Sequence, residues 1–538
     1  MLTAISPTAS GTQSTPTLPP DDPASLLQET TQEGPGDPSS EVSGNIIQPS
    51  ASPEPTQAPL SEAPPVIPLA HKTLQLNVNG HSLELPLEKN NAVFDVATLN
   101  TEHPASFELV TDDDTLKVML DSKTAQANEK TEIAIDRIAY NEYIPVTVTD
   151  GQDIRTLFIR TLNSSIPKLS AAGESQTDGH YYLSFTTLPL ILKLNGAGEI
   201  VYYNYVEKEL PAQPESEEAD PYFGVGLWDF QKHILEDGSV RYSYFEQDPA
   251  YNKLALRGFA AGSHVVLDEN YMEIDRVYMT DGDGDANAVE GHDFIMLADG
   301  HYIISNYELT LVDNIPANLV PNPQGSKVVA AHLREVKDGK ALLDWYSTDY
   351  PALYALSEEG YHDFANSESQ QPDYAHFSSM AIDPKDGNLV CSFRNMSTIL
   401  KIDRETGDIV WMLSGRGDQF GMTAAQKTSG QSTVRYAEDG SLVIFDNGRA
   451  TGQTRILRLT LDERAMAVER FEEFEIEGRY TEFGGNADNI SGDVFCIGWG
   501  MFEGEAAALT EIDFESNKKL FELTLPEGVY TFRCAKFE

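Results

Sequence analysis

Residues 373–415, DYAHFSSMAIDPKDGNLVCSFRNMSTILKIDRETGDIVWMLSG, decide the fold, because they contain four short strands joined by turns. Apolar and polar residues alternate with a period near two, which indicates β-strands. Turns are marked by Asp386-Gly387 and by residues 406–408. The stretch therefore predicts a four-stranded antiparallel unit, with His376 on its first strand and Arg394 at the end of its second.

Looser copies of this unit follow one another from residue 166 onward. In each copy a turn of sequence Asp-Gly, or Ser-Gly in the last copy, leads into an apolar strand, and the intervals between these turns are 59, 62, 87, 53 and 52 residues. The turns begin at Asp178, Asp237, Asp299, Asp386, Asp439 and Ser491. Repeats of this kind are typical of a β-propeller, whose blades close a ring. We therefore predict an all-β protein with a six-bladed β-propeller over residues 166–538.

Two segments of different character precede the repeats. Residues 72–165 contain short strands at even spacing and an Asn79-Gly80 hairpin signal, so they predict a small β-sandwich. Residues 1–70 contain no Lys or Arg and 14 of the 30 Pro of the chain. Such a segment buries too little apolar surface to offset the entropy lost on ordering, and we expect a disordered, acidic, Pro/Ser/Thr-rich tail.

The tail also bears on location. A Pro/Ser/Thr-rich tail ahead of a β domain often tethers that domain outside a cell. We therefore expect an extracytoplasmic protein, which is secreted, periplasmic or surface-tethered, and whose signal or anchor lies upstream of Met1 or has been removed. An intracellular protein with a disordered tail is the alternative. The longest apolar runs are far shorter than the ~20 residues of a membrane-spanning helix, so we expect no transmembrane span in this sequence.

The charge restricts the partners. The 538 residues include 37 Lys and Arg against 85 Asp and Glu, which gives a net charge of −48. Nucleic acid and anionic membrane surfaces need the opposite sign, so we expect neither as a partner. An anionic substrate would need a local cationic pocket. The three Cys lie in apolar strand-like segments without a Cys-x-x-Cys motif, which predicts buried thiols and no zinc ribbon.

Polar residues near the predicted inner strands are the candidates for a site in the central channel. His292 and Ser432 each lie seven residues before the turn of their blade, and His376 lies ten residues before its turn. These positions are equivalent in three successive blades, so we expect them to converge on one channel mouth. Arg394, one strand later than His376, can reach inward from a bulge.

The repeats and these strands together resemble the bacterial arylsulfotransferase family, the sulfotransferases that use no nucleotide sulfate donor. The resemblance covers roughly residues 72–538. It is most specific in residues 376–415, with DGSLVIFDNG (439–448) and YTFRCAKF (530–537) in support. It implies a six-bladed propeller that moves a sulfuryl group from a phenolic sulfate ester to a phenol by a ping-pong route, through a transiently sulfated histidine and without a cofactor.

The resemblance also implies roles for individual residues. The two helper histidines of the family match His292 and His376, and its arginine matches Arg394. The position of the nucleophilic histidine is occupied by Ser432, and no His follows His376 in the chain. A sulfated serine would have a poor alkoxide leaving group, so we do not expect Ser432 to serve as the nucleophile.

Three functions stay open at this point. In the first, the protein is an aryl-sulfate sulfotransferase for a small phenolic sulfate donor and a phenol acceptor, in which His292 or His376 replaces the missing nucleophile or transfer is direct. Cationic donors suit this chemistry, because negative charge develops on the leaving and attacking oxygens. In the second, the propeller is catalytically inactive and binds a sulfated or phenolic ligand or a protein partner. In the third, it is an extracellular adhesion or scaffold protein.

One further stretch concerns a metal. Residues 281–287, DGDGDAN, place carboxylate oxygens at alternate positions, as at the start of a calcium loop. Ala286 stands where such loops have Gly, and His292 stands where they have Glu. We expect a solvated acidic turn without a metal, with calcium as the alternative.

Overall fold

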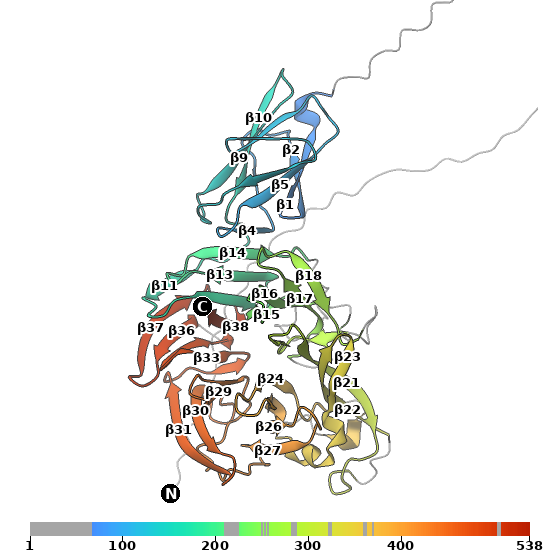
Figure 1. The fold of residues 1–538 in the computed structure, drawn as a ribbon, viewed down its shortest axis with the longest axis vertical. Helices are drawn as coiled ribbons and strands as arrows, with labels where there is room; N and C mark the ends of the chain where they lie inside the picture. Colours follow the sequence, from blue (N-terminus) through green and yellow to red (C-terminus); the bar gives the residue numbers. More distant parts are fainter. Residues whose placement is uncertain are drawn as a thin grey trace, which may run out of the picture. The chain divides into compact units, whose positions relative to one another are not determined.

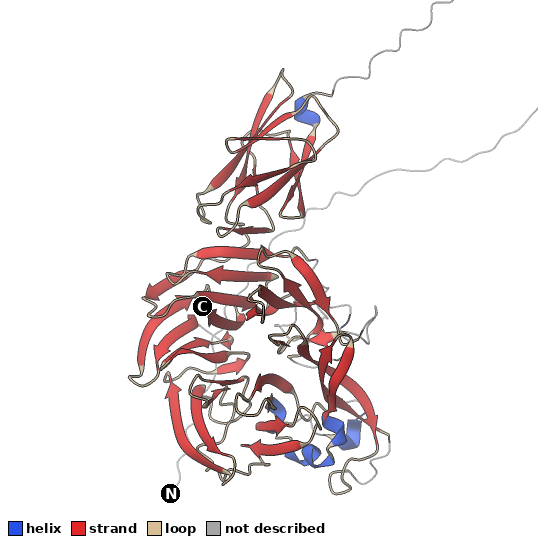
Figure 2. Cartoon of the chain, viewed as in Figure 1, coloured by secondary structure: helices blue, strands red, loops and turns tan. Residues whose placement is uncertain are grey.

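The computed structural model describes residues 67–208, 225–248, 251, 254, 258–280, 288–320, 325–358, 363–367, 371–502 and 507–538. Nearly all of the predicted tail and the whole of the calcium-loop stretch 281–287 lie outside these residues. The described part consists of β-strands and loops with a few short helical turns (Figure 2). The prediction of an all-β protein is therefore confirmed. No helix in the described part is both long and apolar enough to cross a membrane.

The first strands of the described chain form two antiparallel-rich sheets. One sheet has the order β2-β1-β5-β8 and the other the order β3-β10-β9-β6-β7. The first comprises β1 (Thr73–Val78), β2 (His81–Pro86), β5 (Ala105–Val110) and β8 (Lys130–Ile133). The second comprises β3 (Val93–Phe94), β6 (Lys117–Leu120), β7 (Lys123–Ala125), β9 (Tyr143–Thr149) and β10 (Ile154–Arg160). Alternate residues of β1, β5 and β9 are buried, and the buried residues of both sheets belong to one hydrophobic core, as in a β-sandwich.

The remaining strands form the propeller, whose blades follow one another around a common centre (Figure 1). The strand pairing groups most of the described strands into units of four, which we number as blades 1 to 6; blades 1 and 2 belong to one ten-stranded sheet, in which β12 pairs with β15. Blade 1 consists of β38 (Thr531–Phe537), β12 (His180–Phe185), β13 (Leu190–Leu194) and β14 (Ile200–Tyr205). Blade 2 consists of β15 (Leu227–Ile234), β16 (Val240–Gln247), β17 (Ala261–Leu267) and β18 (Glu273–Val277). Blade 3 consists of β20 (Ile295–Met296), β21 (Tyr302–Val312), β22 (Ser326–Lys337) and β23 (Lys340–Tyr346).

The other three blades follow the same plan, with the first strand nearest the centre. Blade 4 consists of β24 (Phe377–Ile382), β25 (Leu389–Phe393), β26 (Thr398–Ile402) and β27 (Ile409–Leu413). Blade 5 consists of β28 (Val434–Tyr436), β29 (Leu442–Asp446), β30 (Arg455–Asp462) and β31 (Ala467–Glu475). Blade 6 consists of β33 (Asn486–Ser491), β34 (Val494–Gly498), β36 (Ala507–Asp513) and β37 (Lys518–Thr524). All residues of β25, β26 and β29 are buried, because both faces of these strands pack against neighbouring blades.

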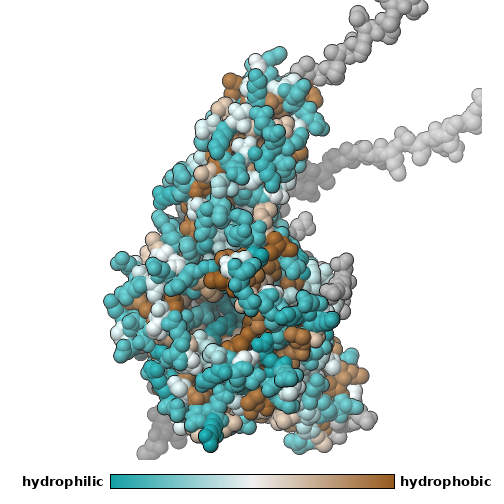
Figure 3. Space-filling model, in the orientation of Figure 1, coloured by the Kyte–Doolittle hydropathy of each residue, from teal (hydrophilic) through white to brown (hydrophobic). Residues whose placement is uncertain are grey.

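The ring closes on the last strand of the chain. β38 follows blade 6 in sequence but pairs antiparallel with β12, so blade 1 combines the two ends of the propeller. This pairing leaves no open edge at the centre of blade 1. The space-filling view shows a hollow at the centre of the ring, bordered largely by hydrophilic residues (Figure 3).

Candidate active site

The three predicted channel positions lie just before the inner strands of their blades rather than within them. His292 lies between β19 (Val289–Glu290) and β20, His376 directly precedes β24, and Ser432 lies two residues before β28. All three residues are buried.

The structure brings His292 and His376 together. Their ring centroids lie 5.3 Å apart, and the two rings are almost perpendicular. Each imidazole has a carboxylate at Nδ1: Glu290 Oε2 lies 2.5 Å from Nδ1 of His292, and Asp373 Oδ2 lies 2.5 Å from Nδ1 of His376. A carboxylate at this position keeps the proton on Nδ1, so that Nε2 carries a lone pair that can take up a proton or another electrophile.

The two carboxylates are themselves fixed and buried. The backbone N–H of His292 donates to Glu290 Oε2 at 2.8 Å, and the hydroxyl of Ser305 donates to the other oxygen of this carboxylate. The side chain of Asn395 donates to the carbonyl oxygen of Asp373 at 2.6 Å and so holds this residue in its loop. Burial lowers the pKa of His292, while Glu290 opposes the shift. His292 is therefore neutral at neutral pH and can act as a base.

His376 has an unusual backbone conformation. Its φ is 52°, in the left-handed region that residues other than Gly rarely occupy. This conformation costs on the order of 1–2 kcal/mol and persists only where the surroundings impose it. The backbone N–H of Arg394 donates to the His376 carbonyl at 2.8 Å, and that of Asn395 donates to the Ala375 carbonyl at 3.1 Å. Such strain is concentrated at functional sites.

Arg394 lies in a short helical turn after β25 and not in a bulge. Its backbone contacts His376, but its guanidinium lies over the ring of Phe483, 4.9 Å from the centroid, on β32 (Thr481–Phe483). Its charge still acts within the site, because it opposes the rise that burial causes in the pKa of Tyr307. The Tyr307 ring in turn lies 5.3 Å from the His376 ring and 6.0 Å from the His292 ring. Arg394 is therefore joined to His376 through its backbone, while its guanidinium lies against β32.

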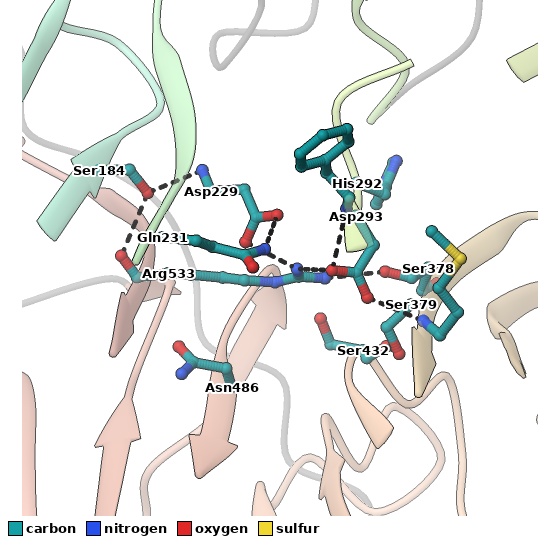
Figure 4. A network of polar contacts seen from close by, with 12 residues as sticks. Ser184, Asp229, Gln231, His292, Asp293, Ser378, Ser379, Ser432, Asn486 and Arg533 are labelled. Atoms are coloured by element: carbon teal, nitrogen blue, oxygen red, sulfur yellow. Dashed lines mark hydrogen bonds and ion pairs between the residues drawn. The ribbon is translucent and has the colours of Figure 1, made fainter. Parts of the chain in front are cut away.

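Ser432 is tied to the inner strand of blade 4 through its backbone. Its N–H donates to the Phe445 carbonyl at 3.0 Å, and its carbonyl accepts from the hydroxyl of Ser379 at 3.1 Å. Figure 4 shows Ser432 beside Ser379, with His292 and Asp293 in the same view. The structure therefore brings His292 and His376 together and places Ser432 against the inner strand of blade 4.

A buried network of charges, which the sequence analysis did not single out, lies directly beside His292. Asp293 accepts from both terminal nitrogens of Arg435, at 3.0 and 3.1 Å, and from Nη1 of Arg533 at 3.1 Å. Nη1 of Arg533 also lies 3.0 Å from Asp229, and its Nη2 donates to the Ser378 carbonyl at 2.9 Å (Figure 4). We call Asp229, Asp293, Arg435, Asp488 and Arg533 the axial network.

The axial network joins all six blades, because Asp488 of blade 6 contacts Arg435 and Ser378 belongs to blade 4. It contains three carboxylates and two guanidinium groups, so full ionisation would leave one buried negative charge. Burial raises the pKa of Asp229 to about 6, although Arg533 opposes the shift. Burial would likewise raise the pKa of Asp293, but Arg435 and Arg533 together lower it. Asp229 therefore holds a proton more readily than Asp293 does.

The residues missed by the sequence analysis fall into two groups. Glu290 and Asp373 had a local signal, because an acidic residue stands two or three positions before each histidine. The partners in the axial network had none, because Arg533 lies 304 residues from Asp229 and 240 from Asp293 in the chain.

Comparison with solved structures finds matches of low sequence identity and low TM-score. Virginiamycin B lyase from Staphylococcus aureus is 13% identical, with a TM-score of 0.31, and the match covers 67% of this chain and 99% of the lyase. The periplasmic gluconolactonase PpgL of Pseudomonas aeruginosa is 11% identical, with a TM-score of 0.35 and coverages of 64% and 82%. The β-propeller domain of Cps50 (Swd1) from Myceliophteria thermophila is 8% identical, with a TM-score of 0.31 and coverages of 67% and 100%.

A search of curated proteins finds no match to this chain. The family model "Arylsulfotransferase (ASST)" matches residues 231–533, which is more than half of the chain and includes His292, His376, Arg394 and Ser432. The family resemblance found in the sequence is thereby confirmed: the chain belongs to the arylsulfotransferase family.

Proposed function

We propose that this protein is an active aryl-sulfate sulfotransferase that moves a sulfuryl group from a small phenolic sulfate ester to a phenol, without a nucleotide donor, at the site formed by His292, His376 and Arg394. Membership of the family supports sulfuryl transfer between phenols at the level of the family. The observation that carries the proposal for this chain is the pair of imidazoles 5.3 Å apart, each with a buried carboxylate at Nδ1.

The carboxylates argue for catalysis over binding alone. A negative charge beside the site weakens the binding of an anionic ligand, because like charges repel at short range. The same charge favours catalysis, because it orients the imidazole and stabilises the cationic ring that forms when Nε2 takes up a proton or a sulfuryl group. A pocket that only held sulfate would be better served by uncharged partners at Nδ1.

The remaining groups suit the transfer itself. Negative charge develops on the oxygen of the leaving phenol and on the oxygens of the transferred group, and preorganised donors stabilise this charge. The guanidinium of Arg394 is such a donor and stays ionised at every working pH. Ser432 would contribute at most one hydrogen bond to a sulfuryl oxygen.

The alternative function is that of a catalytically inactive propeller that binds a sulfated or phenolic ligand or a protein partner. Ser432 is the observation that favours it, because the family places its nucleophilic histidine at this position. In either function we propose an extracytoplasmic location, supported by the Pro-rich composition of residues 1–70, and no nucleic-acid partner, supported by the net charge of −48.

The decisive assay is the release of 4-nitrophenol from 4-nitrophenyl sulfate with and without phenol. It is applied to the protein as it stands and to the variants His292→Ala, His376→Ala and Ser432→His. We expect release that depends on phenol, and its loss in both alanine variants. His180→Gln is the matched control, because His180 lies at the start of β12, away from the two imidazoles. If the unchanged protein releases no 4-nitrophenol and Ser432→His does, the result would establish the binding function instead.

A further inference from the structure

We infer that His376 has replaced the missing blade-5 histidine as the residue that accepts the sulfuryl group, with Asp373 as its positioning residue and His292 as the base. The inference rests on the proposed sulfotransferase function. It is carried by three features of His376: its paired carboxylate, its link to Arg394 and the glycine beside its Nε2.

The first feature is the Asp373–His376 pair. The carboxylate lies 2.5 Å from Nδ1, and both side chains are buried, with exposed fractions of 5% and 7%. When Nε2 acquires a sulfuryl group, the ring becomes cationic, and the adjacent buried carboxylate compensates this charge. The labile sulfated imidazole is thereby stabilised long enough for an acceptor to bind.

The second feature is the link to Arg394. Phe377 and Phe393 are partners in the β24–β25 ladder, and the N–H of Arg394 donates to the His376 carbonyl. His376 directly precedes β24 and Arg394 directly follows β25, so the two residues are neighbours at the same end of this hairpin. Any shift of the hairpin moves both together, which keeps the sulfuryl-binding guanidinium in register with the attacking imidazole. The left-handed backbone of His376 belongs to this arrangement.

The third feature is the glycine that lies beside Nε2 of His376. A β-carbon at Gly258 would lie 3.7 Å from both Nε2 and Cε1 of His376, so a larger side chain there would cover the reactive nitrogen. The φ of Gly258 is 72°, which favours glycine independently. Residue 258 therefore places only its backbone, and no side chain, beside Nε2 of His376.

His292 differs in its surroundings and suits the second role. Its ring is enclosed by three aromatic rings at centroid distances of 5.9 to 6.1 Å, those of Phe532, Tyr307 and Trp228. This enclosure lowers its pKa, so that the ring is neutral and can accept a proton at neutral pH.

The reaction then balances in two steps. In the first, the lone pair of His376 Nε2 attacks sulfur, the bond from sulfur to the aryl oxygen breaks, and the leaving group takes that electron pair and departs as a phenolate. In the second, neutral His292 removes the proton of the acceptor phenol, the phenol oxygen attacks sulfur, and the bond from sulfur to Nε2 breaks. His376 recovers its lone pair, and His292 releases the proton to solvent and is neutral again for the next cycle.

The test is to locate the sulfuryl group on the unchanged protein. The chain is mixed with 4-nitrophenyl sulfate carrying radiolabelled sulfur, without an acceptor, and is denatured at alkaline pH and digested with trypsin. The Lys and Arg positions place His292, His376 and Ser432 on three separate peptides, residues 277–327, 341–385 and 428–435. Fragmentation then distinguishes His376 from His362 in the second peptide.

We expect stoichiometric labelling at His376 that phenol discharges. Labelling at His292 or Ser432 would overturn the inference and leave the proposed function intact, as would acceptor-dependent turnover without any labelled peptide. Absence of both 4-nitrophenol release and label would overturn the proposed function and the inference with it.

Two matched variants test the roles separately. Ser432→Ala should still be labelled at His376, with a rate within about tenfold of the unchanged protein, as for loss of one hydrogen bond. Asp373→Asn should slow labelling on the order of 10²-fold or more, and displace its pH dependence, while the KM for the donor changes little. Asp237→Asn, in the exposed turn of blade 2, is the control for Asp373. A shift in the pH dependence of labelling is a readout that mere loss of stability would not produce.

Discussion

Arg533→Met tests whether the axial network holds the six blades together. The guanidinium is buried and binds Asp229 at 3.0 Å, Asp293 at 3.1 Å and the Ser378 carbonyl at 2.9 Å. Asp293 still has its ion pair with Arg435 in the variant, whereas Asp229 loses its ion pair with Arg533. Removal of one member of a buried ion pair costs roughly 3–5 kcal/mol, because the other charge stays buried and uncompensated. We therefore expect the free energy of unfolding to fall by about that amount near pH 8.

The cost should depend on pH in a defined direction. Because burial raises the pKa of Asp229 to about 6, the folded protein holds this proton to a higher pH than the unfolded chain, in which Asp titrates at ~3.9. The free energy of unfolding therefore falls as the pH rises between these two values. Loss of Arg533 raises the pKa of Asp229 further, so the pH range over which the free energy of unfolding falls extends to higher pH. The variant should accordingly lose less stability near pH 5 than near pH 8.

Urea denaturation followed by tryptophan fluorescence measures both effects, with Lys519→Met as the matched control. Lys519 makes a half-exposed pair with Glu522 at 2.6 Å, and its loss should cost no more than about 1 kcal/mol at either pH. The double variant Arg533→Met with Asp229→Asn should recover part of the loss, because it removes the unpaired charge. A cost below about 1 kcal/mol near pH 8, or an equal cost at both pH values, would refute the reasoning.

Three further outcomes follow from the site and the blades. Glu290→Gln should move the acid limb of the pH profile of kcat/KM to lower pH, because Glu290 raises the pKa of His292 and so opposes the effect of burial. An unchanged acid limb would show that Glu290 does not act on the catalytic base. Gly258→Val should reduce kcat at least about tenfold by covering His376 Nε2, and an undiminished kcat would contradict the role assigned to this glycine. Lys401→Ala leaves three carboxylates around a vacated position and should make thermal stability depend on added calcium or magnesium, measured as the shift of Tm; equal Tm values with and without the ion would contradict this. The three carboxylates are Asp383, Asp386 and Glu463.

The propeller could be predicted from the sequence because its signals are local. The period of two within strands such as residues 398–402, and the turns that begin at positions such as Asp386 and Asp439, are readable within a few residues. The closure by β38 could not be predicted, because its pairing with β12 joins segments about 350 residues apart through backbone bonds that carry no side-chain pattern. The limits of the sandwich at residues 72 and 165 stay a prediction.

The site could be predicted in part for the same reason. His292, His376 and Arg394 were found by their positions relative to the turns and by the family resemblance. The roles of Glu290 and Asp373 could not be predicted, because they depend on the contact of each carboxylate with Nδ1 of a histidine, which only the structure shows. The turn that places Arg394 beside Phe483 depends on contact with β32, which lies 88 residues later in the chain.

The measurement that tests the central claim most directly is the burst of 4-nitrophenol from 4-nitrophenyl sulfate in the absence of an acceptor. The claim is that a histidine of this channel carries the sulfuryl group although blade 5 has Ser432. It predicts a rapid release close to stoichiometric with the protein, then a halt, and renewed release when phenol is added. Stopped-flow absorbance resolves the burst, and His376→Ala should abolish it. A flat trace from the unchanged protein with and without phenol would contradict the claim.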